Sequence, residues 1–104
     1  MEIYVILSTG KLVLAWSVVG EQQECEGREI GKGKMDSIDD CAKACREHAS
    51  MFVFGTNDFG VDRCDMTGCN CLCETGARSD GTCDTADHRG YRLYKFSISG
   101  NIHI

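Results

Sequence analysis

The stretch GCNCLCE, residues 68–74, places cysteine at every second position, at Cys69, Cys71 and Cys73. In a β-strand alternate side chains point to the same face, so the three sulfurs would lie on one side of the strand. Neighbours on that face are about 6.6 Å apart with parallel side-chain directions, which is a poor geometry for a disulfide between them. Their bonding partners are therefore expected elsewhere in the chain.

The cysteine content of the chain indicates a disulfide-rich fold. The chain has 104 residues, enough for one domain, and eight of them are cysteine. This density is typical of small domains made in an oxidising compartment, where disulfides support a modest hydrophobic core. Eight is an even number, so every thiol can be paired. The formal net charge of −5 argues against nucleic acid or an anionic membrane as the main partner.

The segment MDSIDDCAKACREHAS, residues 35–50, has the pattern of an amphipathic helix. Ser37 is a suitable N-cap, with Asp40 three residues on. Five residues fall on one face at helical spacing: Ile38, Cys41, Ala42, Cys45 and Ala49. Apolar and aromatic runs predict strands at residues 51–55, 70–74 and 91–96, with a weaker candidate at residues 25–31. The sequence therefore predicts an α+β fold in which one α-helix packs across a small antiparallel β-sheet.

The helix offers partners for the cysteine strand. Cys41 and Cys45 lie one turn apart, about 6 Å along the helix axis, which matches the spacing of alternate residues in a strand. The strand at residues 51–55 follows the helix closely and should run antiparallel to it, so the next strand should run parallel to the helix. The expected bonds are then Cys41–Cys71 and Cys45–Cys73, as two rungs of a ladder.

The other four cysteines complete one of the 105 pairings that eight cysteines allow. Cys64 and Cys69 are five residues apart and can close the loop that enters the cysteine strand. Cys25 and Cys83 remain, and a bond between them would tie the start of the domain to its end.

A metal site is the other use of clustered cysteines. A structural zinc site usually shows Cys-x₂₋₄-Cys knuckles, and only Cys41 and Cys45 have that spacing. The acidic residues of the segment 57–68 do not follow the pattern of a calcium loop. The three histidines are scattered: His48, His88 and His103. We therefore predict neither a metal nor another cofactor.

The first 20 residues differ from the rest, with one acid, one base and no cysteine. They have features of a secretory signal: Lys11 ends the n-region, residues 12–19 are a short apolar run, and Val18 and Gly20 suit cleavage after Gly20. The alternative is a β-hairpin in which IYVIL and LVLAWSVV are joined at STGK. We favour the signal because the cysteines require export.

The predicted organisation therefore has three parts. Residues 1–20 are the signal peptide, 21–97 the disulfide-rich domain and 98–104 a C-terminal tail. Eight apolar residues are too few to span a bilayer, which needs about 20. The mature chain is thus expected to be secreted, without membrane insertion.

The order of these features resembles the PAN/apple family. DCAKACREHASMFVFG (40–55), GCNCLCE (68–74), a distal cysteine and GYRLYKF (90–96) are similar to the family's two-cysteine helix, aromatic strand, cysteine strand and closing strand. The likeness covers residues 25–96. It implies that the outermost cysteines, Cys25 and Cys83, form a pair. It also implies that the first helix cysteine bonds the region of Cys71.

The chain departs from the family pattern at one cysteine. The second helix cysteine, here Cys45, normally bonds a cysteine just before the aromatic strand, and Met51 stands near that position. Cys73 is the obvious substitute, which agrees with the ladder. PAN/apple modules are extracellular, recognise proteins or carbohydrates and lack catalytic machinery. The resemblance implies an extracellular glycan or protein as the partner.

Motifs for catalysis are missing from the sequence. It contains no Gly-x-Ser-x-Gly, His-Glu-x-x-His or phosphate-binding glycine motif. The run GKGK at residues 31–34 is interpreted as a turn because no Walker pattern surrounds it. We predict that the protein is not an enzyme.

The polar segment 55–68 carries the first two candidates for ligand binding, Phe59 and Arg63. An aromatic ring beside an arginine on a loop is a plausible binding anchor. The alternative, which we favour for Phe59, is that its ring tucks beneath the loop and completes a small core.

Further candidates are Arg78 and Arg92, which together with Arg89 can receive carboxylates or acidic glycans. The alternative function is a small secreted effector, a toxin or a protease inhibitor. In that case CETGARSDGTC, residues 73–83, would present Arg78 on a loop bracketed by cysteines.

Overall fold

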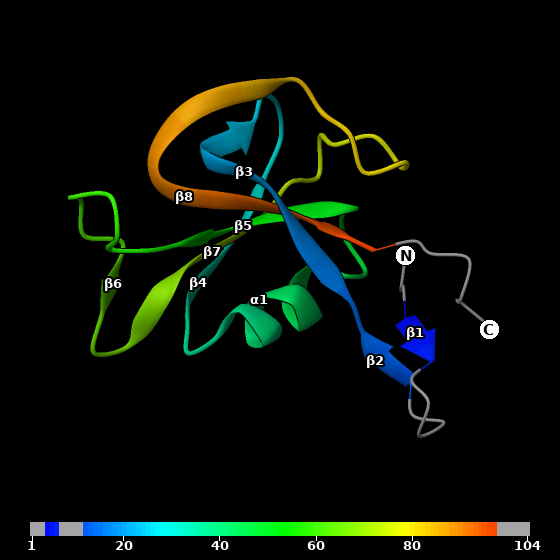
Figure 1. Cartoon of the computed structure of the whole chain (residues 1–104), viewed down its shortest axis with the longest axis horizontal. Coiled ribbons are helices and arrows are strands. Elements are labelled where there is room, and N and C mark those ends of the chain that lie inside the picture. Colours follow the sequence, from blue (N-terminus) through cyan, green and yellow to red (C-terminus); the bar gives the residue numbers. More distant parts are fainter. Residues whose placement is uncertain (1–3, 7–11, 98–104) are drawn as a thin grey trace.

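Nine short elements make up the described part of the chain, residues 4–6 and 12–97, with side chains described from residue 15 onward. In the computed structural model these elements are β1 (Tyr4–Ile6), β2 (Leu12–Leu14), β3 (Trp16–Cys25), β4 (Ile30–Met35), α1 (Ile38–Cys45), β5 (Met51–Gly55), β6 (Cys64–Asp65), β7 (Gly68–Cys73) and β8 (Thr85–Phe96). Figure 1 shows α1 on one face of the main sheet and the segment 74–84 on the other.

Strand β5 is the centre of this sheet. The strand order is β3-β8-β5-β7-β4, every neighbouring pair is antiparallel, and β6 pairs with β7 as a short hairpin. All five residues of β5 are buried. The predicted fold class, a small antiparallel sheet with one helix across it, is confirmed.

Helix α1 begins directly after the predicted cap. The Ser37 hydroxyl accepts a hydrogen bond of 3.1 Å from the amide of Asp40, which satisfies one of the free donors of the first turn. The helix ends at Cys45, earlier than the predicted span 35–50. The amides of His48 and Ala49 donate to the Cys45 carbonyl and turn the chain towards β5.

A hydrophobic core lies on each face of the sheet. On the helix face, β5 and β8 contribute four aromatic rings: Phe52, Phe54, Tyr94 and Phe96. On the opposite face, the same two strands contribute Met51, Val53, Tyr91 and Leu93. The alternation of side chains along MFVF and YRLYKF therefore fills both cores.

Four disulfides join these elements: Cys25–Cys83, Cys41–Cys71, Cys45–Cys73 and Cys64–Cys69. The pairs coincide with the expected set. Two of them join successive turns of α1 to alternate residues of β7. Strand β5 runs antiparallel to β7, as expected from the short connection between α1 and β5. A chain with several disulfides belongs to an oxidising environment such as the extracellular space. No helix within the described ranges is long and apolar enough to cross a membrane.

Strands β4 and β8 and the turn before β4 differ from the prediction. Residues 26–29, inside the predicted strand 25–31, form the turn between β3 and β4. The predicted turn at residues 31–34 instead lies in β4 and pairs with β7 through a bulge. Strand β8 begins at Thr85 rather than at residue 91. An edge strand that is mostly exposed carries little apolar pattern, so periodicity does not reveal it.

Part of the predicted signal peptide forms regular structure in the whole chain. Strands β1 and β2 pair as a short hairpin, as the alternative interpretation expects, and residues 16–20 are the first half of β3. The Trp16 ring lies 5.4 Å from the Tyr94 ring and its Nε1 donates to Asp39 at 3.2 Å. Cleavage after Gly20 stays a prediction, and it would remove these contacts. The predicted tail, 98–104, lies outside the described residues.

Candidate functional site

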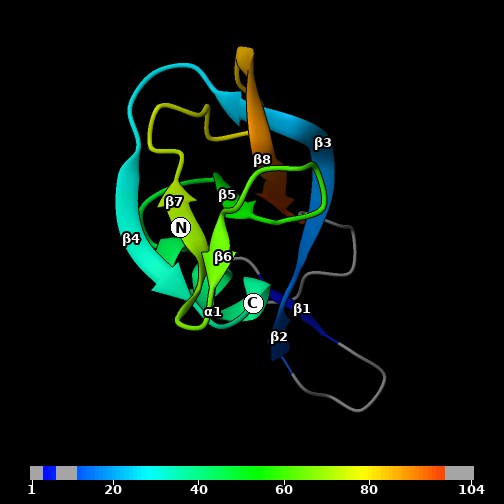
Figure 2. The ribbon, with the colours of Figure 1, turned by 90° about the vertical axis from the view of Figure 1, so that its left-hand side faces the viewer.

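The loop 56–63, which links β5 to β6, is organised by the side chain of Asn57. Its Oδ1 accepts hydrogen bonds from the amides of Arg63 (2.8 Å) and Cys64 (2.9 Å), and its Nδ2 donates to the Cys64 carbonyl (3.2 Å). Figure 2 shows this loop closing one end of the sheet, beside β6. A loop held in one shape loses little conformational entropy when it binds a partner.

Phe59, in the middle of this loop, is half-buried and belongs to neither hydrophobic core. The guanidinium carbon of Arg92 lies 5.2 Å from the centre of its ring, within cation–π distance. Glu21 and Asp58 hold the guanidinium there through contacts of 3.2 and 3.0 Å. The favoured expectation that Phe59 completes a core is therefore corrected: the ring packs under Arg92 at the surface.

Arg63 makes a second stack, with Tyr91. Its guanidinium carbon lies 4.8 Å from the ring centre, and its Nε and Nη2 donate to the Arg89 carbonyl at 3.2 and 3.0 Å. Gly90, at a φ of 87°, leaves room for it, because a Cβ there would lie 2.7 Å from Arg63 Cγ. Since Tyr91 and Arg92 point to opposite faces of β8, the two stacks do not form one patch. We infer that Arg63 fixes the loop and thereby positions Phe59.

A polar groove of about 380 Å³ adjoins the Phe59–Arg92 stack. Its lining residues are Glu21, Gln22, Asp87 and Arg89. The groove lies at an irregularity in the pairing of β3 with β8. Glu21 pairs with Arg92 and Gln23 with Asp87, so one residue of β3, Gln22, stands opposite the four residues 88–91 of β8. Gln22 adopts a φ of 54°, a left-handed conformation that non-glycine residues rarely adopt. Backbone of this kind clusters at functional sites.

Phe59, Asp58, Arg92 and this groove together form what we name the Phe59–Arg92 surface. Its charges are nearly balanced, since Arg89 and Arg92 stand beside the carboxylates of Glu21, Asp58 and Asp87. The pKa of Asp58 is lowered because the hydroxyl of Thr56 and the guanidinium of Arg92 hydrogen-bond to it. The surface thus offers an aromatic ring among charges of both signs, with no excess of positive charge.

Arg78 lies away from this surface. Figure 1 places the yellow segment around residue 78 at the other end of the molecule from the green loop 56–63. The guanidinium of Arg78 pairs with Asp84 at 3.2 Å. Its carbonyl accepts hydrogen bonds from the Gly81 amide and the Ser50 hydroxyl, and its amide donates to the Thr82 carbonyl. The backbone at Arg78 is therefore bonded within a closed turn.

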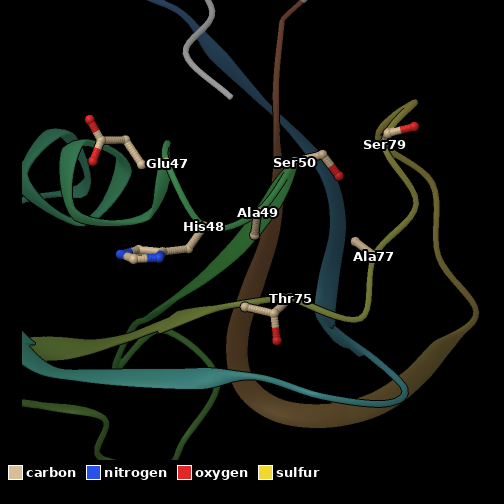
Figure 3. Close-up of a pocket in the computed structure, with 7 residues that line it drawn as sticks. All are labelled: Glu47, His48, Ala49, Ser50, Thr75, Ala77 and Ser79. Carbon is tan, nitrogen blue, oxygen red and sulfur yellow. The ribbon is translucent and has the colours of Figure 1, made fainter.

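A groove of about 220 Å³ lies beside this turn, at the end of α1 (Figure 3). It is lined by Glu47, His48, Ala49, Ser50, Thr75, Ala77 and Ser79. The His48 ring and the Ser50 hydroxyl point to opposite sides in Figure 3. His48 Nε2 lies 3.4 Å from Lys32 Nζ, and the Ser50 hydroxyl is used by Arg78. The two side chains therefore do not form a nucleophile and base pair.

The cysteine sulfurs do not make a metal site. The sulfurs of Cys41, Cys45 and Cys71 lie within 4.8 Å of one another, a spacing that also occurs in metal centres. Each belongs to a disulfide, so none provides the thiolate that a metal requires.

The structure brings three of the four candidate residues, Phe59, Arg63 and Arg92, to the same end of the sheet and leaves Arg78 elsewhere. Sequence analysis missed Asn57 and Gln22, which shape the loop and the groove. The Asn-Asp pair before Phe59 is a recognisable turn signal, whereas nothing in the sequence marks Gln22. Comparison with protein-family models, with curated proteins and with solved structures finds no match, so the PAN/apple resemblance stays a prediction.

Proposed function

We propose that this chain is a secreted, disulfide-stabilised module that binds an extracellular protein or carbohydrate through the Phe59–Arg92 surface. The observation that carries the proposal is the stack of Arg92 on Phe59, held by Glu21 and Asp58 on a loop that Asn57 keeps in one shape. Aromatic residues and arginine are the side chains that most often dominate binding interfaces. The PAN/apple resemblance and the four disulfides are consistent with this role.

The charge balance favours a protein over a polyanionic glycan. Binding to a sulfated or otherwise polyanionic chain needs an excess of basic residues, but each arginine of this surface stands beside carboxylates. Protein surfaces, in contrast, can match a mixed pattern of charges around an aromatic anchor. A neutral glycan that stacks on Phe59 is the second ligand class that this surface suits.

The protease-inhibitor alternative receives no support from the geometry at Arg78. A protease must bind the backbone on both sides of the bond that it attacks, and it must reach the carbonyl. At Arg78 the carbonyl and the amide are both engaged within the turn. We do not propose a catalytic function either, since His48 and Ser50 do not contact each other and the sequence has no catalytic motif.

The proposal is tested by probing arrays of extracellular proteins and glycans with the oxidised full chain. Phe59→Ala and Arg92→Ala should each weaken the strongest signal at least tenfold, as expected for interface anchors. Arg28→Ala is the matched control, because Arg28 is exposed and distant in sequence from the loop. Equal losses for all three variants, or none, would refute the assignment, provided that melting temperatures show all three to be folded.

A further inference from the structure

A third groove, separate from the Phe59–Arg92 surface, lies between β3, β8 and the segment 81–85. Its volume is about 280 Å³. Most of its walls are apolar and come from Val19, Met51, Leu93 and the disulfide sulfur of Cys83. Two polar side chains of the lining, Thr85 and Lys95, can donate hydrogen bonds to a ligand. We name it the Lys95 groove.

The floor of the Lys95 groove is preformed. Met51 and Leu93 are 2% and 1% exposed and belong to the core of this face, and the Cys25–Cys83 disulfide packs beside them. The sulfur of Met51 lies 3.6 Å from that of Cys25. Val19 forms a rim and is 44% exposed. The floor is therefore rigid but shows a ligand little surface, so apolar contacts would come mainly from the Val19 rim and from Cys83.

Lys95 places a positive charge at the groove. Its aliphatic stem runs along Gly81, whose φ is 82° and where a Cβ would lie 3.4 Å from Lys95 Cδ. Within the described ranges, neither the Lys95 ammonium nor the Thr85 hydroxyl has a hydrogen bond or ion pair. Other cations, such as Lys34 and Arg92, are paired with carboxylates. A cation that has no partner among the described residues and lies beside an apolar groove attracts a ligand with one anionic end.

We propose that the Lys95 groove binds a medium-chain alkyl carboxylate. The alkyl chain lies against Val19 and the Cys25–Cys83 disulfide, above the buried Met51 and Leu93, and the carboxylate accepts hydrogen bonds from the Lys95 ammonium and the Thr85 hydroxyl. Because Val19 lies within the predicted signal peptide, the proposal concerns the full chain and not residues 21–104. The Phe59–Arg92 surface takes no part in this binding, so the proposal is independent of the proposed function.

The test is a titration of the oxidised, ¹⁵N-labelled full chain with sodium octanoate, followed by amide chemical shifts. Saturable shifts should centre on residues 81–85 and 93–95 and on Val19. Octyltrimethylammonium, which has the same chain and the opposite charge, should bind at least tenfold more weakly. Phe59→Ala should leave octanoate binding unchanged, which separates this site from the other surface.

Two pairs of variants make the test specific. Lys95→Gln should weaken octanoate binding about fivefold, as expected for one partly exposed ion pair, whereas Lys95→Arg should retain it and Lys43→Gln on α1 should not change it. Val19→Ser should also weaken binding, whereas Val18→Ser, at a neighbour that is 48% exposed but outside the groove, should not. Equal affinity for the anionic and cationic amphiphiles, or shifts spread over both faces of the sheet, would overturn the proposal.

Discussion

Replacing the buried Glu74 with glutamine should remove a fall in stability that the wild type shows as the pH rises from about 4.5 to 8. Glu74 follows β7 and is fully buried. Its Oε2 accepts a hydrogen bond of 2.6 Å from the Cys25 amide, whereas its Oε1 is buried without a hydrogen-bond partner among the described residues. Burial raises the pKa of Glu74 to about 8, helped by the neighbouring carboxyl of Glu29 and by the negative charge of Glu24, and opposed by the hydrogen bond from the Cys25 amide.

The sign of the effect follows from the direction of this shift. Because the pKa of Glu74 is higher in the folded state than its ordinary value of 4.5, the folded protein binds more protons than the unfolded chain between these two values. The free energy of unfolding should therefore fall as the pH rises from about 4.5 to 8 and should level off above pH 8. At about 1.36 kcal/mol per pKa unit, the loss is at most about 5 kcal/mol.

Glu74→Gln keeps the shape of the side chain and an oxygen for the Cys25 amide but carries no proton to lose. The variant should match the wild type near pH 5 and exceed its stability by about 2–5 kcal/mol at pH 9. The assay is guanidinium unfolding at several pH values between 4.5 and 9, with all disulfides intact. The lowered pKa values of Asp58 and Asp80 place their titrations below this range.

The exposed Glu47→Gln is the matched control and should leave the pH dependence unchanged. Glu29→Gln removes the like charge beside Glu74 and should reduce the slope without abolishing it. The reasoning is refuted if the wild type becomes more stable between pH 5 and 8, or if Glu74→Gln gains nothing at pH 9.

Four further predictions concern the disulfides and the N-terminal segment. Intact mass should rise by eight hydrogens on reduction, and the denatured, unreduced protein should not react with alkylating reagents; two or more reactive thiols would contradict the four-disulfide structure. The pair Cys64→Ser/Cys69→Ser should lower the melting temperature less than Cys41→Ser/Cys71→Ser, because the longer loop restricts the unfolded chain by roughly 1.5 kcal/mol more and because loss of Cys41 also opens the helix–sheet core. The opposite order would count against the ladder. A chain of residues 21–104 should melt several degrees below the full chain because it lacks Trp16 and half of β3, as judged by circular dichroism. Removal of residues 1–20 on export is a separate prediction: N-terminal sequencing of secreted protein should begin at Glu21, and a secreted protein that retains Met1 or Glu2 would contradict it.

The helix, the central strands and their cross-links could be predicted because two periodicities coincide. One helical turn and two strand residues both advance the chain by about 6 Å, so Cys41 and Cys45 match Cys71 and Cys73 without any knowledge of the fold. Strands β5 and β8 could be predicted from the sequence because their apolar residues alternate between the two cores. In each case the local pattern and the tertiary contact require the same spacing.

The edge strands and the Phe59–Arg92 surface could not be predicted in this way. Strand β4 is exposed and rich in glycine and lysine, so its residues carry no apolar alternation. The groove depends on a loss of register between β3 and β8, which is a property of two strands about 70 residues apart in the chain. Phe59 and Arg92 meet only because loop 56–63 folds back to β8, and a single sequence does not reveal that contact.

The position of β5 between two cores has a consequence for how the chain folds in the cell. Its sequence, MFVFG, is apolar, rich in residues that favour strands, and uncharged, which is the composition of an aggregation-prone segment. The helix that covers one face is only eight residues long, too short to be stable alone, and the rungs at Cys41 and Cys45 hold it in place.

The opposite face of β5 is covered by the segment that Cys25–Cys83 holds against the sheet. On each face of β5, disulfides thus hold the covering segment in place. Before these disulfides form, both faces of the strand are exposed and can self-associate. The yield of soluble protein should therefore depend on how quickly thiol oxidation follows synthesis, and expression in a reducing compartment should give aggregates that begin at residues 51–55.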